Sequence, residues 1–295
     1  MKPVRRSLFA AALAVLAAIP APVAGAKTWT PRLAYFSFQG GGDARLFSML
    51  SDGTGKRRAG TGFPPSYVGQ WSVPAGRAVY FHQFPSGNTD IYTVRREGDD
   101  RMRLTKTPNA EWQPSWSRDG KRIAFARFMG SSWDVFIMKW DGTHVRRVTT
   151  TGEDEFFPIW KPDGTRLAFS RKIAEDQFDI FTINTNGTDE QRVTNDGSSF
   201  FNFVGGWSPG NTKLVYWQFD GADSAINTID TDGTDPLTLV PGPGLNEYPV
   251  WLPNGQIAYS SDADGDFEVW VMESDGTDQT QLTHNGVPDF TGFID

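Results

Sequence analysis

The chain of 295 residues contains no cysteine and only three histidines. The lack of cysteine excludes disulfide bonds, thiolate nucleophiles, iron–sulfur clusters and cysteine-ligated zinc sites. His82, His144 and His284 lie far apart in the sequence, so a site with several histidine ligands has little to build from. The net charge of −7 leaves no excess positive charge for non-specific contacts with nucleic acid. We therefore predict no nucleic-acid partner and no resident cofactor, with bound Ca²⁺ as the one open alternative.

Long hydrophobic runs are absent after the first 26 residues. Those residues resemble a signal peptide, with a basic start at Lys2, Arg5 and Arg6, an apolar run over 8–19 and a small-x-small cleavage site at 24–26. We expect cleavage after Ala26 and export to the periplasm or the exterior, without a membrane span in the mature protein. The adjacent Arg5 and Arg6 also resemble a twin-arginine signal, which leaves the export route open.

A tripeptide of the type Asp/Asn-Gly-Thr recurs along the chain, and its glycines stand at 53, 142, 187, 233 and 276. Glu97-Gly98-Asp99 is a degenerate sixth copy. A second series of tryptophans keeps the same phase, at Trp71, Trp116, Trp160, Trp207 and Trp251. Two independent markers in one phase predict a structural repeat of about 45 residues.

Each repeat predicts four short strands and no helix. In one example, the strand that leads to Trp116 is followed by strands at 122–125, 134–136 and 147–149, with turn residues between them. Four strands per 40–45 residues are typical of β-propellers, and the regular tryptophans are expected to fill the core. Six hairpin turns predict an all-β, six-bladed β-propeller of four-stranded blades.

The missing sixth tryptophan indicates how the ring closes. Phe293 lies near the C-terminus at the place where the next tryptophan is due, and the strand that should follow is found at residues 32–36. We therefore expect the C-terminal inner strand to join the N-terminal strands, a closure that removes exposed sheet edges.

The repeats resemble those of the TolB-like family, also described as WD40-like PD40 repeats. Trp160-Lys161-Pro162-Asp163-Gly164, Leu167-Ala168-Phe169 and Asp90-Ile91-Tyr92 are similar to that family's pattern. The resemblance implies a propeller over residues 27–295. The family's namesake is a periplasmic protein of the Tol–Pal envelope system that binds the lipoprotein Pal through its propeller. Related propellers gate prolyl-oligopeptidase-type peptidases and form oligogalacturonate lyases.

Two local motifs have a competing chemical interpretation. Residues 206–210 match G-x-S-x-G, but the match falls in phase with the turns that follow the other tryptophans, so we interpret it as a repeat turn and not as a nucleophile elbow. Asp262, Asp264 and Asp266 alternate as in a calcium loop. Because Phe267 stands where an EF-hand needs glycine, an ordinary acidic turn is the competing interpretation of this segment.

Acidic and aromatic residues precede the tryptophans and are predicted to gather at one mouth of the channel. The candidate binding residues are Tyr67, Glu111, Trp112, Glu155, Phe156, Phe203, Glu247, Tyr248 and Asp289. Such a mouth suits a cation, a basic peptide segment or a sugar stacked on a ring. The competing interpretation is that the polar groups solvate the strand ends and the rings pack between blades. The loops at this end vary in length and content, and variable loops on a rigid scaffold often carry binding.

Three functions remain open from the sequence. The first is an exported, non-enzymatic scaffold, monomeric, that binds a protein or another ligand in the cell envelope. The second is a polysaccharide lyase or glycosidase that uses Glu111, Glu155 and Glu247. The third is a structural calcium-binding propeller. The fold alone cannot decide among them, because propellers host both binding and catalysis.

Overall fold

The computed structural model describes residues 32–38, 44–58, 68–72, 74–95, 99–195, 197 and 200–293. The predicted signal peptide and Tyr67 lie outside these residues. All 24 regular elements of the described residues are strands, in agreement with the all-β prediction. Among these residues no helix is long and apolar enough to cross a membrane.

Three sheets consist of four consecutive antiparallel strands each. Their strands are β4 (Val68–Ser72), β5 (Arg77–Gln83), β6 (Thr89–Arg95) and β7 (Met102–Arg103); β8 (Glu111–Trp116), β9 (Arg122–Phe128), β10 (Trp133–Lys139) and β11 (Arg146–Arg147); and β20 (Asn246–Trp251), β21 (Ile257–Ser261), β22 (Glu268–Met272) and β23 (Thr280–Gln281).

A larger sheet of eight strands contains two successive groups of four. The strands are β12 (Glu155–Trp160), β13 (Arg166–Ala174), β14 (Gln177–Asn184), β15 (Gln191–Arg192), β16 (Phe201–Trp207), β17 (Lys213–Phe219), β18 (Ser224–Asp230) and β19 (Leu237–Val240). Among the described residues, the one strand pairing between the two groups is the parallel pairing of Phe178 in β14 with Phe201 in β16.

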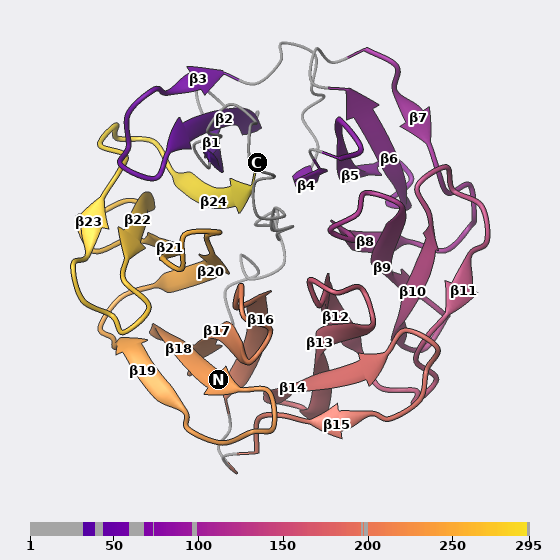
Figure 1. Ribbon diagram of the computed structural model, residues 1–295. Coiled ribbons are helices and arrows are strands. Elements are labelled where there is room, and N and C mark those ends of the chain that lie inside the picture. The colour runs from indigo at the N-terminus through magenta and orange to yellow at the C-terminus, as the bar shows by residue number, and fades with distance from the viewer. Residues whose placement is uncertain are drawn as a thin grey trace, which may run out of the picture.

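The remaining sheet combines both ends of the chain. β24 (Asp289–Phe293) pairs with β1 (Arg32–Phe38), which continues to β2 (Ala44–Leu50) and β3 (Arg57–Arg58). Phe293 stands opposite Leu33, as Trp116 stands opposite Ile123 in β8 and β9. Figure 1 shows the sheets around a common centre, with yellow β24 beside indigo β1 and β2. The predicted pairing of the two chain ends is therefore present.

From β8 through β12, β16 and β20 to β24, the strand nearest the centre packs against the corresponding strand of the next sheet. We call these five the inner strands. The tryptophans that end four of them, β8, β12, β16 and β20, fill the space between sheets, as predicted: Trp116 is 0% exposed and Trp251 is 5% exposed. The Trp160 indole donates a hydrogen bond to the carbonyl of Ser115 in the neighbouring sheet at 3.2 Å. The side chain of Trp71 is outside the described residues.

The Asp-Gly-Thr turns connect the third and fourth strands of a sheet and contact the neighbouring sheet. In the turn at residues 141–143, the Asp141 carboxylate accepts hydrogen bonds from the backbone N–H and the hydroxyl of Thr143 at 3.0 and 2.6 Å. Gly142 has a φ of +82°, and a Cβ atom added there would lie 2.7 Å from the carbonyl oxygen of Leu104 in the preceding sheet. The glycine is thus required twice, by its backbone conformation and by the close approach of the neighbouring sheet.

Substitution of Gly142 tests this double requirement. Alanine there must adopt a left-handed conformation, which costs about 1–2 kcal/mol, and must also displace Leu104, which costs about 1–3 kcal/mol more. Gly152 is a matched control, because its φ is +85° and nothing lies within 4 Å of an added Cβ. In urea unfolding we expect Gly142→Ala to lose clearly more stability than Gly152→Ala. Equal losses would show that the contact with the neighbouring sheet contributes nothing.

Candidate functional site

The predicted channel-mouth residues lie where the inner strands β8, β12, β16, β20 and β24 begin. We call this end of the sheets the entry face. The connection from β9 to β10 and the connection from β13 to β14 lie at the same end, because strands alternate in direction within each sheet. The Asp-Gly-Thr turns lie at the opposite end.

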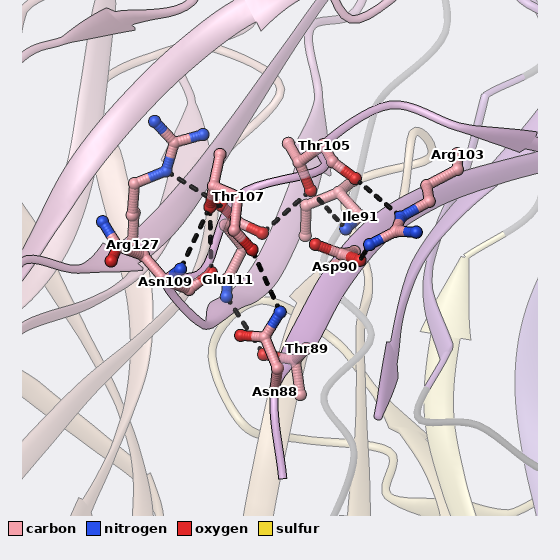
Figure 2. A network of polar contacts seen from close by, with 10 residues as sticks. All are labelled: Asn88, Thr89, Asp90, Ile91, Arg103, Thr105, Thr107, Asn109, Glu111 and Arg127. Carbon is pink, nitrogen blue, oxygen red and sulfur yellow. Dashed lines mark hydrogen bonds and ion pairs between the residues drawn. The ribbon is translucent and has the colours of Figure 1, made fainter. Parts of the chain in front are cut away.

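Glu111 begins β8 and is 0% exposed. Its carboxylate accepts hydrogen bonds from the hydroxyls of Thr105 and Thr107 at 2.8 and 2.6 Å and from Arg127 Nε at 3.0 Å. Its backbone N–H donates to the Thr89 hydroxyl at 3.0 Å. Figure 2 shows that the threonines come from the preceding sheet and its connection to β8, so the carboxylate joins two sheets. Burial raises the pKa of Glu111, while the threonine hydroxyls and Arg127 act in the opposite direction.

The preceding sheet supplies a second acid to the same network. The Thr105 hydroxyl accepts a hydrogen bond from the backbone N–H of Ile91 at 2.9 Å, and Arg103 Nε donates to the Thr105 carbonyl at 3.1 Å. The Arg103 guanidinium also forms an ion pair with Asp90, which is fully buried. Each acid in Figure 2 is therefore accompanied by its own arginine.

The next junction repeats this arrangement around Glu155, which begins β12 and is 0% exposed. Its carboxylate accepts hydrogen bonds from the hydroxyls of Thr149 and Thr151 and from Arg171 Nε, the last at 2.9 Å. Burial raises the pKa of Glu155, opposed chiefly by Thr149 and Arg171. The guanidinium of Arg147 pairs with Asp134 at 2.8 Å, as Arg103 does with Asp90.

Two further junctions use neutral groups at the same positions. Asn202 in β16 accepts a hydrogen bond from the Gln218 amide at 3.0 Å, where a glutamate and an arginine stand in the earlier sheets. Asn246 in β20 accepts one from the Ser261 hydroxyl at 2.7 Å. In these four junctions, a glutamate at the start of the inner strand and an arginine opposite it are thus either both present or both absent.

Glu111 and Glu155 are predicted from the sequence to bind a ligand at the channel mouth. Both carboxylates are buried and occupied by hydroxyls and guanidinium groups, so a ligand would have to displace internal hydrogen bonds to reach them. The structure gives them a role in joining sheets. It provides no exposed carboxylate pair at these two positions for the predicted glycan chemistry, so that function remains a sequence prediction.

Glu247 shares a predicted binding role with Glu111 and Glu155, but it occupies a different position in its inner strand. It stands opposite Ser260, as Phe156 stands opposite Ser170, so it replaces an aromatic ring of the other inner strands. Counting back from each tryptophan would have revealed this, since Glu247 is four residues before Trp251 and Glu111 is five before Trp116. Burial, reinforced by the charge of Asp262, raises the pKa of Glu247 to about 7, and a hydrogen bond with Tyr248 partly opposes the shift.

Asp289 begins β24 and is 0% exposed. Its carboxylate accepts a hydrogen bond from the Asn285 amide at 2.6 Å. Burial is the main cause that raises the pKa of Asp289 to about 6, and the charge of Glu268 adds to the increase.

The predicted aromatic residues form a continuous band along the entry face, which we call the aromatic band. Neighbouring rings contact one another from sheet to sheet, with centroids 4.4 to 6.4 Å apart. Its members are Trp112, Trp133, Phe156, Phe157, Phe203, Trp217, Tyr248 and Phe290. Four of these rings, Trp112, Trp133, Phe203 and Phe290, are only partly buried. The band thus serves as core on one side and as surface on the other.

A backbone irregularity was not foreseen from the sequence. Gln113, Phe157 and Tyr248 have φ values of +53°, +56° and +53°, and each interrupts the register of its inner strand. Such conformations cost of order 1–3 kcal/mol each and persist only where the surroundings hold them. Here the Gln113 side chain accepts a hydrogen bond from the backbone of Phe157 at 2.7 Å, which ties one bulge to the next. Each of the three residues precedes a proline, which is the sequence signal that could have indicated them.

The two local motifs also have definite places. Ser208 of the G-x-S-x-G match lies in a turn, where its hydroxyl accepts a hydrogen bond from the backbone of Lys213 at 3.0 Å, as Ser117 does from Arg122 at 2.9 Å. The interpretation as a repeat turn is therefore confirmed.

The predicted calcium loop has other contacts in the structure. Asp262 accepts a hydrogen bond from the backbone N–H of Leu245 at 2.7 Å, and Asp264 accepts one from the Gln281 amide at 2.6 Å. Within the described ranges, no group of three or more histidine, cysteine or acidic side chains is placed to hold a metal ion. Calcium binding by Asp262, Asp264 and Asp266 remains a sequence prediction.

Comparison with known proteins gives one family and a set of similar folds. Residues 28–241 match the family described as TolB beta propeller domain, PD40. No curated protein matches the chain. TolB from Acinetobacter baumannii has a similar structure, with 21% identity and a TM-score of 0.73 over 88% of this chain, which spans 65% of that protein's length.

Two other solved structures are similar. A protein described as putative TolB from Agrobacterium tumefaciens has 17% identity and a TM-score of 0.68, with coverage of 89% of this chain and 91% of that one. An oligogalacturonate lyase in complex with manganese has 14% identity and a TM-score of 0.59, with coverage of 87% and 75%. At these identities the structural matches show the fold alone.

The pairing of Glu111 with Arg127 yields a stability test. Arg127→Gln leaves a buried carboxylate without its cation, which costs about 3–5 kcal/mol. The double variant with Glu111→Gln as well reproduces a neutral pair like that of Asn202 and Gln218, so we expect urea unfolding to show that most of the loss is recovered. Some loss should remain, because Arg127 also lies over the Phe136 ring at 4.7 Å. A double variant no more stable than Arg127→Gln would contradict the proposed pairing.

Glu247 yields a pH test. Its pKa is raised from 4.5 to about 7 on folding, so the folded protein holds this proton more tightly than the unfolded chain. That contribution is complete below about pH 4.5 and is lost as the pH rises to about 7, a loss of roughly 3 kcal/mol. Glu247→Gln cannot ionise, so we expect it to match the wild type near pH 4 and to exceed it by about that amount at pH 8 in urea unfolding. A stability difference that is the same at both pH values would argue against a buried, titrating Glu247.

Proposed function

The chain belongs to the TolB beta propeller domain family, and from this premise we propose that it is an exported, non-enzymatic scaffold that binds a protein or peptide partner on its entry face. The observation that carries the proposal is the aromatic band, whose partly exposed rings Trp112, Trp133, Phe203 and Phe290 lie on the variable-loop end of the sheets. Aromatic side chains contribute strongly to protein interfaces because they bury a large, rigid apolar area.

We further propose that the eight-stranded sheet counts as two blades, which with the other sheets gives a closed ring of six. Among the described residues, the only strand pairing between the two halves is the single pair of Phe178 with Phe201, and each half contains four strands in the order of the other sheets. A Cβ atom added at Gly53 would lie 3.4 Å from the Leu282 side chain. The turn at Gly142 approaches Leu104 of its neighbouring sheet in a similar way. The first and last sheets therefore meet as the other neighbours do.

The proposed location is the periplasm or the exterior, and the proposed assembly is a monomer. The signal-like residues 1–26 and the family membership support export. Acidic residues of the entry-face loops, including Glu153, Asp154, Asp220 and Asp262, favour a basic segment in the partner.

Variants at exposed residues on the two ends of the sheets distinguish binding at the entry face from binding at the opposite end. Met129 is exposed at 40% in the entry-face connection between β9 and β10, and Trp140 is exposed at 43% in an Asp-Gly-Thr turn at the other end. We expect Met129→Glu combined with Phe203→Ala to abolish capture of an envelope partner in a pulldown with the mature protein, and Trp140→Glu to leave it unchanged. Circular dichroism and thermal unfolding serve as folding controls.

The reverse result, loss with Trp140→Glu and retention with the entry-face variant, would move the binding surface to the opposite end. Failure of the wild-type protein to retain any envelope component above a bead control would count against a scaffold role. Cross-linking at residue 129 then identifies whether a captured partner lies against the entry face itself.

A further inference from the structure

Two buried carboxylates meet where the sheet of β20–β23 adjoins β24 and β1. Glu268 in β22 is 1% exposed and Asp289 in β24 is 0% exposed. Asn285 lies between them, because its backbone N–H donates to Glu268 Oε1 at 2.7 Å and its amide donates to Asp289 Oδ2 at 2.6 Å. The charges of the two acids are close enough for each to act on Tyr35 in β1.

Acids at the position of Glu268 are accompanied by arginine in three other sheets. The pairs are Asp90 with Arg103, Asp134 with Arg147 and Asp179 with Arg192. Near Glu268 the arginine position is taken by Gln281, since Gln281 pairs with Trp270 as Arg147 pairs with Phe136. The Gln281 amide donates to Asp264 at 2.6 Å, and Glu268 gains no cation from it.

Asp289 likewise has no arginine at the position opposite it. Glu111 and Glu155 begin their inner strands opposite Arg127 and Arg171. Asp289 begins β24 opposite Ser37. Within the described part of the chain, neither Glu268 nor Asp289 forms an ion pair with a lysine or arginine.

One buried carboxylate oxygen at this junction, Glu268 Oε2, has no hydrogen-bond partner among the described residues. Asp289 has only neutral partners: hydrogen bonds from Ser37, Asn285 and Thr283 lower its pKa against the effect of burial. Ser37 is itself 1% exposed. Neutral donors leave both charges of this buried pair without a cation, which is destabilising, so the junction needs a positive charge where the other junctions have a guanidinium.

We propose that a hard divalent cation binds between Glu268 and Asp289, with Ser37 as a further oxygen ligand, and links β22 to β24 and β1. Two carboxylates and a hydroxyl form an all-oxygen donor set, and two negative charges match a divalent ion. Ca²⁺ accepts irregular oxygen geometry more readily than Mg²⁺ does, which makes it the appropriate probe. The site joins the two ends of the chain and is separate from the contacts of Asp264.

The test uses the full mature chain, freed of metal with EDTA and then titrated with CaCl₂. We expect one Ca²⁺ per chain by calorimetry and an increase in Tm of about 5 °C at a concentration 100-fold above Kd. Glu268→Gln and Asp289→Asn should each abolish the calcium-dependent increase. Asp134→Asn is the matched control, because that acid is paired with Arg147, and it should keep the increase. Asp264→Asn should also keep it.

A further variant, Ser37→Arg, distinguishes loss of calcium binding from loss of folding. Ser37→Arg places a guanidinium where Arg127 and Arg171 stand in other sheets, so we expect it to melt above the wild type in EDTA and to be insensitive to CaCl₂. If Ca²⁺ does not raise the Tm of the wild type, the proposal is overturned. The same holds if only a lower pH raises the Tm, because protons would then compensate the two acids in place of a metal ion. A response that persists in both Glu268→Gln and Asp289→Asn, or that disappears in Asp264→Asn, would place the ion elsewhere.

Discussion

Acidic side chains are buried where neighbouring sheets meet, and their need for partners is the constraint on which the rest of this structure depends. The first residue of β8 or β12 takes its cation from its own sheet and accepts hydroxyl hydrogen bonds from the end of the sheet before it. Glu111 pairs with Arg127 and accepts a hydrogen bond from Thr105 (Figure 2), and Glu155 does the same with Arg171 and Thr149 one junction later. Removing water from a carboxylate is costly unless such partners are complete, so the arginine compensates the charge while the hydroxyls link one sheet to the next.

The same constraint governs where the molecule can vary. Asn202 with Gln218 and Asn246 with Ser261 show that a junction tolerates neutral groups when both partners change together. The junction of Glu268 and Asp289 keeps its acids and lacks both arginines, and it is also the junction that unites the two chain ends. A ring closed there by a bound ion would tie the integrity of the fold to its ionic surroundings.

The entry face combines rigidity with exposure. The left-handed residues Gln113, Phe157 and Tyr248 interrupt the inner strands where the aromatic band lies, and hydrogen bonds between sheets hold that conformation. The partly buried rings are therefore fixed before any partner arrives, which reduces the entropy lost on binding. A preorganised aromatic surface bordered by acidic loops suits a scaffold better than it suits a catalytic site whose acids are already occupied.

The sequence by itself determined the repeat, the all-β class, the tryptophan core and the pairing of Phe293 with Leu33, because turn residues and alternating strands are local signals with a constant spacing. It also placed the aromatic residues on one end of the sheets.

Only the tertiary structure decided that the Glu111 and Glu155 side chains are buried between sheets and that Glu247 occupies a position held by an aromatic residue in other inner strands. Burial depends on neighbours about 40 residues away in adjacent sheets, as Phe157 and Gln113 are, and charge compensation depends on an arginine on the neighbouring strand, as Arg127 is for Glu111. A local pattern carries no information about such contacts.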